Sequence, residues 1–134
     1  MPTAVSFLDT AAVLRYLYAD LSRISQVSSD NIKLHPADRD LLSPSKPPLK
    51  GLPAVQKHED ALIAATGGTL IMDVESITAN ADFGTVLGTL RATKEGQQDL
   101  AIPFCGVWRF EGGKAVEHWE NAADAEGIGR WLSS

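Results

Sequence analysis

The spacing of apolar residues changes once along the chain, at about Thr69. Before this point Leu14, Leu17, Leu21 and Ile24 recur every three or four residues, which is the spacing of one face of an α-helix. After it, the stretch "TLIMDVESITA" alternates apolar and polar residues, which is the period of a β-strand. Helices followed by strands predict an α+β domain, with the helices on one face of a curved antiparallel sheet.

The individual elements follow from the same patterns. Helices are expected at residues 9–25 and 54–65, the second ending at two glycines. A short strand is expected at residues 31–35, and the proline-rich stretch after it should be an ordered surface loop. Four further strands are expected at residues 69–79, 85–93, 101–110 and 114–121, followed by a short helix at 124–134. The 134 residues are expected to form a single domain, long enough to bury a core beside a ligand cavity.

Composition argues against several kinds of partner. The net charge is −5 and the 12 Lys and Arg residues are scattered, so no nucleic-acid partner is expected. No apolar run approaches the roughly 20 residues that span a bilayer, so no membrane partner is expected either. Cys105 is the single cysteine and the first residues lack the pattern of a secretory signal, which together predict a cytoplasmic protein.

The sequence contains no motif typical of a metal or cofactor site. The three histidines and the one cysteine are isolated, without the H-x-E or C-x-x-C spacing of a metal site, so no metal is expected. The sequence has no G-x-G-x-x-G, no Walker loop and no G-x-S-x-G, so no cofactor is expected. Acid and base chemistry on a small apolar molecule remains, or no chemistry at all.

The stretch "FCGVWRFEGGKAVEHWEN" predicts a β-hairpin with two glycines at its turn. With a two-residue loop, Trp108 opposes Glu117, and both share a face with Phe104 and Trp119. This aromatic face should point at the helices. Glu117 would then lie among large rings, and removal from water would raise the pKa of its carboxyl, so that it could exchange protons near neutral pH.

The same hairpin allows two other interpretations. Glu117 could lie at the rim of the sheet, or form an ordinary ion pair with a nearby arginine. Alternatively, a single β-bulge would exchange the two faces of the strand, and His118, Glu120 and Cys105 would line the cavity.

Three more polar residues are candidates for the site. His58 lies three residues after Val55 and four before Leu62, on the apolar stripe of its helix, and is either a core residue or directed into a cavity. Residues alternate between the two faces of a strand, and this alternation predicts that His35 points outward, unless the strand kinks at the proline after it. Asp124 is explained most simply as a helix N-cap, although its carboxylate could also reach a pocket.

A family resemblance rests on the order of these segments. An N-terminal helix, "DNIKLHP", "GLPAVQKHEDALIAATGG" and strands ending in "VWRFEGGKAVEHWENAAD" resemble the SnoaL-like branch of the nuclear transport factor 2-like superfamily. The resemblance implies a cone-shaped domain whose curved sheet wraps around the N-terminal helices and encloses an apolar cavity. Relatives include polyketide cyclases, ketosteroid isomerases, scytalone dehydratases and limonene epoxide hydrolases, which are usually dimeric and cofactor-free.

The resemblance also implies a set of site residues. Glu117 and Glu120 match the acids around the family tryptophan, Asp124 matches a later acid, and His35 falls where H-x-P motifs of the family often face the cavity. The candidate catalytic residues are therefore Glu117, Asp124, Glu120 and His35. The candidate substrate-binding residues are Tyr16, His58, Trp108, Trp119, His118 and Phe104. The long proline-rich loop departs from the family pattern and would reshape the mouth of the cavity.

Two functional hypotheses follow. The first is a cofactor-free enzyme of cyclase, isomerase, dehydratase or epoxide-hydrolase type that acts on a small apolar metabolite. The second is a non-catalytic ligand-binding or dimerisation module of the same fold. A homodimer is expected in either case, from the family pattern and from the second face of the sheet, which keeps Val107 and Val116 among its charges.

Overall fold

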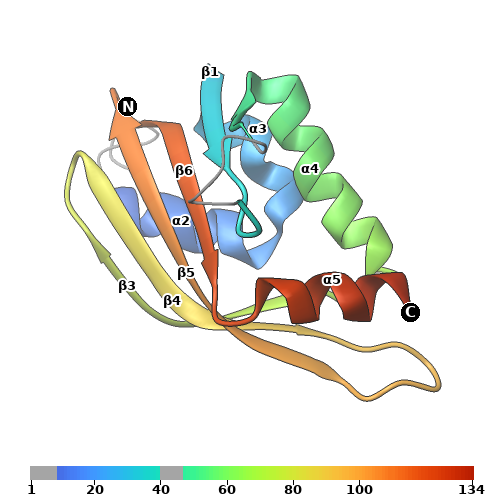
Figure 1. Cartoon of the computed structure of the whole chain (residues 1–134). Coiled ribbons are helices and arrows are strands. Elements are labelled where there is room, and N and C mark those ends of the chain that lie inside the picture. Colours follow the sequence, from blue (N-terminus) through green and yellow to red (C-terminus); the bar gives the residue numbers. More distant parts are fainter. Residues whose placement is uncertain (1–8, 40–46) are drawn as a thin grey trace.

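The computed structural model describes residues 9–39 and 47–134. Residues 1–8 and 40–46 lie outside the described residues. The expectation of an ordered proline-rich loop falls partly on the second range, and the expectation that the first residues are not a secretory signal falls on the first. The elements are α2 (Thr10–Ala19), η1 (Leu21–Arg23), α3 (Ile24–Val27), β1 (Ser28–His35), β2 (Leu49–Lys50), α4 (Leu52–Ala65), β3 (Ile71–Ala79), β4 (Phe83–Ala92), β5 (Leu100–Glu111), β6 (Lys114–Ala122) and α5 (Ala125–Ser133). The predicted arrangement is confirmed: β1 lies between the first helices and α4, and a run of four strands, β3 to β6, precedes α5 (Figure 1).

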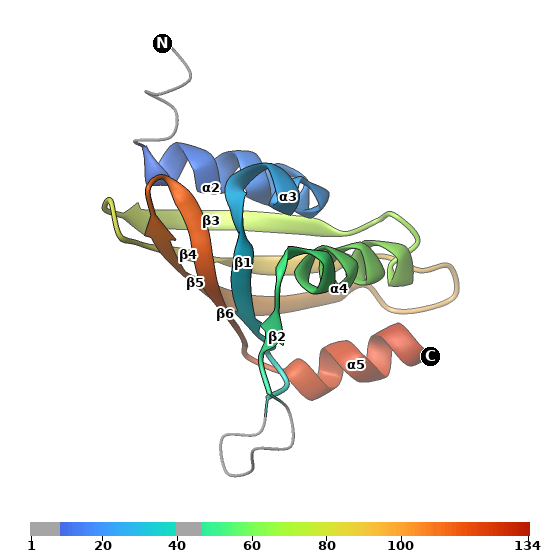
Figure 2. The ribbon, with the colours of Figure 1, turned by 90° about the horizontal axis from the view of Figure 1, so that it is seen from above.

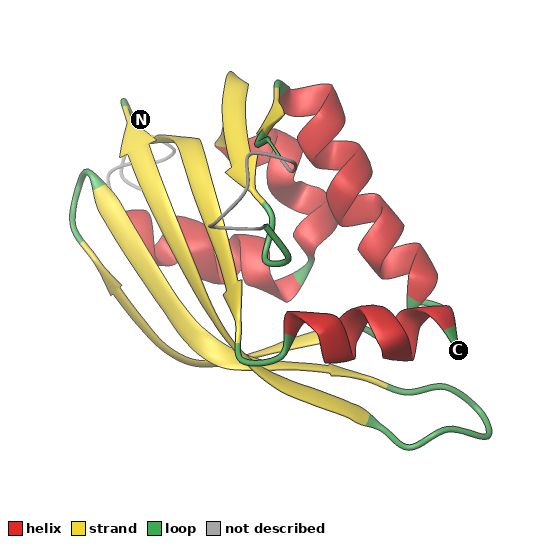
Figure 3. Ribbon diagram, viewed as in Figure 1, coloured by secondary structure: helices red, strands yellow, loops and turns green. Residues whose placement is uncertain are grey.

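The strands form one six-stranded sheet in the order β2-β1-β6-β5-β4-β3. All neighbours are antiparallel except β1 and β6, which run parallel, and the two-residue strand β2 was not predicted. The long strands bend strongly, and the helices cover the side toward which they bend (Figures 1 and 3). The protein therefore has the predicted α+β architecture of a curved sheet around helices.

The helices divide the covered side of the sheet between them. Contacts place α2 against β3 and β4, α4 against β1, and α5 beside β5. Seen from above, α2 and α5 lie at opposite ends of the group of helices, with α4 between them (Figure 2). None of the helices in the described part of the chain is long and apolar enough to cross a membrane.

The predicted first helix is broken into three short ones at Asp20. Asp9 caps the start of α2 by accepting a hydrogen bond from the Ala12 N–H. Asp20 has extended backbone angles, and its carboxylate accepts from the Ser22 N–H at 3.0 Å, which begins η1. An Asp side chain that bonds the backbone two residues ahead competes with continued helix, so the chain turns there.

The core joins the helices to the inner face of the sheet. Leu14, Leu17 and Ile24 are fully buried against a cluster that includes Trp108 and Phe110. Burial of each large apolar side chain stabilises the fold by roughly 1.5–3 kcal/mol. This packing fixes how closely the helices approach the strands, and so fixes the space left between them.

A β-bulge in β6 decides which side chains face that space. The two-glycine turn is confirmed, with Glu111 opposite Lys114 and Phe110 opposite Ala115. The register then shifts, so that Arg109 pairs with Glu117. Val116 is the extra residue, and each residue after it faces the opposite way from its predicted direction. The predicted face of β6 is therefore wrong, and the bulged alternative holds.

Candidate functional site

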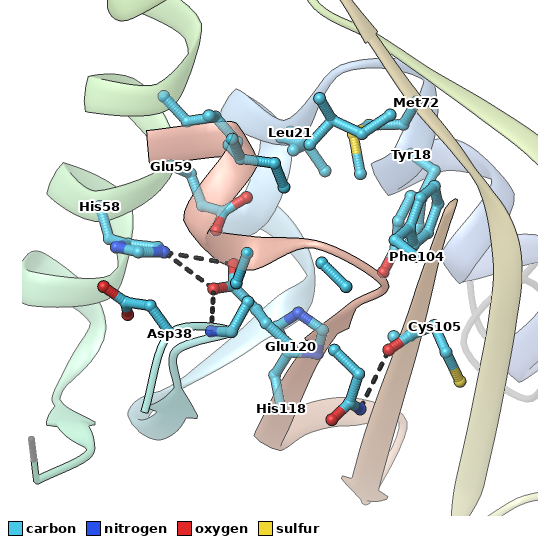
Figure 4. A pocket seen from close by; sticks show the side chains of 18 of the residues that line it. Tyr18, Leu21, Asp38, His58, Glu59, Met72, Phe104, Cys105, His118 and Glu120 are labelled. Carbon is cyan, nitrogen blue, oxygen red and sulfur yellow. Dashed lines mark hydrogen bonds and ion pairs between the residues drawn. The ribbon is translucent and has the colours of Figure 1, made fainter. Parts of the chain in front are cut away.

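A cavity of about 240 Å³ lies between the helices and the inner face of the sheet. Most of its lining is apolar, with Leu21, Leu62, Met72, Leu90, Phe104, Ile128 and Leu132 among the contributors. The ionisable or hydroxyl-bearing residues of the lining are Tyr18, Asp38, His58, Glu59, Cys105, His118 and Glu120. Figure 4 shows His58 and Glu59 on one side of the cavity and Tyr18 with Phe104 on the other. The cavity is thus an apolar chamber with polar groups at two ends.

Glu120 and His58 form a paired acid and base at the first end. The Nε2 atom of His58, on α4, lies 3.2 Å from both carboxylate oxygens of Glu120, on β6. The Ala37 N–H donates to Glu120 Oε1 at 3.2 Å. Burial works against a charged Glu120, but the hydrogen bond from His58 and the nearby imidazoles outweigh it and lower the pKa of the carboxyl. The same hydrogen bond raises the pKa of His58.

Glu59 adds a second carboxyl with the opposite tendency. It follows His58 on α4, is only 4% exposed, and its Oε1 atom has no hydrogen-bond partner in the described structure. Burial, and after it the charge of Glu120, raise the pKa of Glu59 to about 8. At neutral pH the site therefore holds a neutral carboxyl beside an ionised one.

The same three residues could hold a cation. His58, Glu59 and Glu120 each offer one ligand atom, and these atoms lie within 4.8 Å of one another. His58 Nε2 and a Glu120 carboxylate oxygen are 3.2 Å apart, a separation that two ligands about 2.0–2.2 Å from one ion can have. No metal spacing is visible in the sequence, because the ligands come from α4 and β6, which are distant along the chain.

The other end of the cavity is organised by Trp108. Its Nε1–H donates to the Tyr18 hydroxyl oxygen at 3.0 Å, and its ring stacks on His118 with 3.5 Å between centroids. Burial strongly raises the pKa of Tyr18, so the phenol stays neutral. Burial also lowers the pKa of His118 to about 4. The Nδ1 atom of His118 lies 3.0 Å from the Val107 carbonyl, which can only accept, so Nδ1 carries the proton.

Five of the ten predicted site residues line the cavity: Phe104, Trp108, His58, His118 and Glu120. The bulge is the reason that His118 and Glu120 are among them. Cys105 also contributes to the lining, as the bulged alternative predicted, although its sulfur points away from His118 and Glu120 in Figure 4.

Three predicted residues form a separate cluster on the outer face of the sheet. Glu117 accepts from the His35 Nε2 at 2.7 Å and is paired with Arg109. His35 stacks on Trp119 with 5.2 Å between centroids. Partial burial opposes the charge of Glu117, but the hydrogen bonds from His35 and Arg109 prevail and lower its pKa. The prediction of a raised Glu117 pKa is wrong, while the outward direction expected for His35 agrees with the structure.

Asp124 and Tyr16 also lie outside the cavity lining. Asp124 is the N-cap of α5, where it accepts from the Gly127 N–H at 2.8 Å, as its simpler interpretation predicted. Tyr16 is 42% exposed; its hydroxyl donates to Gln26, and the Arg23 guanidinium lies over its ring. Neither residue is placed to touch a ligand in the cavity.

Sequence reasoning missed two residues that helical spacing can identify. Glu59 follows the fully buried Val55 by four residues, and Tyr18 follows the fully buried Leu14 by four. Residues four apart lie on the same face of a helix. The carboxyl of Glu59 and the phenol of Tyr18, each on the buried face of its helix, were therefore the sequence features that could have identified the polar groups of the cavity.

Comparison with known proteins shows the family. Residues 11–118 match the model of the SnoaL-like domain. Because this match covers most of the chain, the chain belongs to the SnoaL-like domain family. No curated protein sequence matches the chain.

Solved structures agree on the fold. Bal32a, from a soil-derived mobile gene cassette, is similar with a TM-score of 0.73 and 20% identity, covering 92% of this chain and 94% of its own. A provisionally assigned SnoaL-like polyketide cyclase from Jannaschia sp. CCS1 has a TM-score of 0.74 at 13% identity, covering 93% and 92%. A cystatin-like-fold protein from Xanthomonas campestris has a TM-score of 0.70 at 18% identity, covering 90% and 92%. At these identities the likeness concerns the fold alone.

Proposed function

We propose that this protein is a cofactor-free acid/base enzyme that acts on a small, largely apolar molecule in the cavity. The observation that carries the proposal is the pair of carboxyls, Glu59 and Glu120, whose surroundings drive their pKa values in opposite directions. Two carboxyls held in different protonation states can serve as acid and base in one reaction. The relationship to provisionally assigned polyketide cyclases is consistent with such chemistry.

The roles follow from the protonation states. Glu120, ionised and hydrogen-bonded to His58, takes a proton from a substrate carbon, and the electrons of the broken C–H bond form a carbon–carbon double bond. Glu59 gives its proton to another substrate atom. That atom is a carbon in an isomerisation, and in a dehydration it is the oxygen of a hydroxyl that leaves as water.

The cavity limits the size of the substrate. Its volume of about 240 Å³ lies below the roughly 300–1,000 Å³ typical of sites for drug-sized ligands. The mainly apolar lining favours a hydrocarbon framework. We therefore expect a molecule of one or two rings.

The test is a pH titration of the side-chain carboxyls by carbon-detected NMR, with an assay in D₂O that follows deuterium uptake by a panel of small cyclic ketones. We expect Glu59 to titrate near 8 and Glu120 below its ordinary value. Glu120→Gln should lower the pKa of Glu59, because it removes a neighbouring negative charge. Glu117→Gln is the matched control on the outer face and should leave both values unchanged.

Two results would reject the proposal. One is a Glu59 whose pKa lies near the ordinary value of about 4.3 for a glutamate carboxyl. The other is a Glu59 titration that moves to lower pH when MnCl₂ or ZnCl₂ replaces EDTA, which would mean that a cation and not a proton holds the two carboxyls together. Tight binding of ligands without deuterium uptake by any of them would favour the non-catalytic binding module.

A dimer is the second proposal, and the outer face of the sheet supports it. Phe83 and Leu87 on β4 are 49% and 43% exposed, and the register puts Val107 of β5 on the same face. Exposed apolar side chains gathered on one face are typical of an interaction site. Sedimentation equilibrium at micromolar concentration should give a dimer, and the double variant Phe83→Asp/Leu87→Asp should give a monomer. A monomeric wild-type protein would contradict the proposal.

A further inference from the structure

Tyr18 presents a hydrogen-bond donor to the cavity. Its oxygen accepts the Nε1–H of Trp108, so its own proton must point elsewhere. Tyr18 is 6% exposed and lines the cavity, and the described residues offer its proton no acceptor. An O–H group fixed by a tryptophan on one side and left unpaired on the other is a preset donor for a ligand.

His118 presents an acceptor close by. Its Nδ1–H is used by the Val107 carbonyl, which leaves the lone pair of Nε2 without a partner among the described residues. The buried polar atoms that lack a partner in the described structure do not include Nε2 of His118. This nitrogen therefore remains accessible to open space. Since His118 lines the cavity, this open space is that of the ligand site.

Gly106 brings the donor and the acceptor together. A Cβ at this position of β5 would clash with the Tyr18 hydroxyl and would lie 3.3 Å from Cε1 of His118. The hydroxyl oxygen and the imidazole edge therefore share the space that the missing side chain leaves open. Trp108 contacts both groups, with its Nε1–H on Tyr18 and its ring against His118.

A neighbouring donor and acceptor are complementary to a hydroxyl group. A ketone oxygen or an ether oxygen only accepts, and can satisfy Tyr18 alone, whereas a hydroxyl accepts from one partner and donates to another. We propose that Tyr18 and His118 form a subsite that recognises an enol or phenol hydroxyl of the ligand, with Trp108 as the positioning residue. The inference rests on the proposed function, because it names a further polar group of the substrate in the same cavity as Glu59 and Glu120.

Three probes of one size class test the subsite by calorimetry: indane, 5-methoxyindane and 5-indanol. Indane offers no polar group, 5-methoxyindane offers an acceptor only, and 5-indanol offers both a donor and an acceptor. Since a hydrogen bond contributes a net 0.5–1.5 kcal/mol, each step along the series should tighten binding by roughly 2- to 10-fold. Equal affinity of wild-type protein for indane and 5-indanol would overturn the proposal.

Variants assign the two hydrogen bonds. Tyr18→Phe should remove the preference for 5-methoxyindane over indane. His118→Phe, which keeps an aromatic ring against Trp108, should remove the preference for 5-indanol over 5-methoxyindane. Near-UV circular dichroism checks that both variants are folded. The nitrogen chemical shift of His118 Nε2 in wild-type protein needs no variant, and it should respond to 5-indanol but not to 5-methoxyindane.

The result that separates this inference from the proposed function comes from Glu120→Gln. If this variant loses the preference for 5-indanol while His118→Phe retains it, the hydroxyl lies at the carboxyl pair, and the subsite is overturned although the acid/base proposal stands. If Glu59 titrates ordinarily but the probe series behaves as expected, the acid/base function fails and the subsite stands.

Discussion

The two faces of β6 carry the same residue types with opposite consequences. On the inner face Glu120 meets His58 and lies near a second carboxyl, Glu59, which is 4% exposed. On the outer face Glu117 meets His35 and Arg109. The outer cluster supplies a guanidinium, whereas the inner cluster has two carboxyls and one imidazole. The second carboxyl of the inner cluster, Glu59, is therefore protonated at neutral pH, which is the state that a general acid requires.

This difference shows that a glutamate–histidine pair alone does not mark an acid/base site. Glu117 and Glu120 are three residues apart on one strand, and each bonds a histidine. The inner pair differs in the buried second carboxyl of Glu59 beside it, and in its arginine: Arg39 donates to the backbone carbonyl of Glu120, whereas Arg109 pairs with the carboxylate of Glu117. Each prediction below changes one face and leaves the other as its control.

The largest expected effect is on turnover. Glu59→Gln and Glu120→Gln should each lower the rate of deuterium uptake into a responsive ketone by about 10²- to 10⁴-fold, the usual contribution of a general acid or base. Glu117→Gln should change this rate less than about twofold, because it alters only the outer face. Equal losses in the inner and outer variants would remove the functional distinction between the two clusters.

The second effect is on the pH dependence of stability. The pKa of Glu59 is about 8 in the folded protein and about 4.3 in an unfolded chain, so folding takes up a proton between these values. The stability from this group is present below about pH 4 and decreases as pH rises toward 8, by at most about 1.4 kcal/mol per pH unit. Chemical denaturation between pH 5 and 9 should show wild-type protein losing stability relative to Glu59→Gln.

Glu117 should behave in the opposite sense. Its folded pKa is lowered, so its contribution is present above the unfolded value and is lost as pH falls through the folded one. Glu117→Gln should therefore differ from wild type most at neutral pH and least in acid. A Glu59→Gln protein with the same pH profile as wild type from pH 5 to 9 would contradict the assignment of the buried proton.

The third effect is on stability at a single pH. Glu59→Met replaces a buried carboxyl with an unpartnered oxygen by an apolar side chain of similar length, and should raise the free energy of unfolding by about 1–3 kcal/mol at pH 9. Glu117→Met removes a partly exposed ion pair and should lower it by no more than about 1 kcal/mol. Urea titrations of the two variants measure both changes, and opposite signs are the expected outcome.

Much of the fold could be predicted from residue spacing. The helical stripe around Leu14 and the alternation after Thr69 fixed the type and order of the elements, because each period reflects one buried face. The turn at Gly112 and Gly113 was predicted for a local reason, since both adopt positive φ. The Asp124 cap is equally local, as it needs only the three residues after it.

The candidate site can likewise be separated into features set by local sequence and features set by the tertiary structure. Amino-acid order by itself determined that β6 carries two acids, a histidine and a tryptophan within four residues, and that His58 lies on the apolar stripe of its helix. Only the tertiary structure decided that Val116 bulges, that His118 and Glu120 therefore face inward, and that α4 brings His58 and Glu59 to Glu120. A bulge depends on how the strand pairs and packs, and the pKa of a buried acid depends on neighbours from distant segments, so neither is encoded in local spacing.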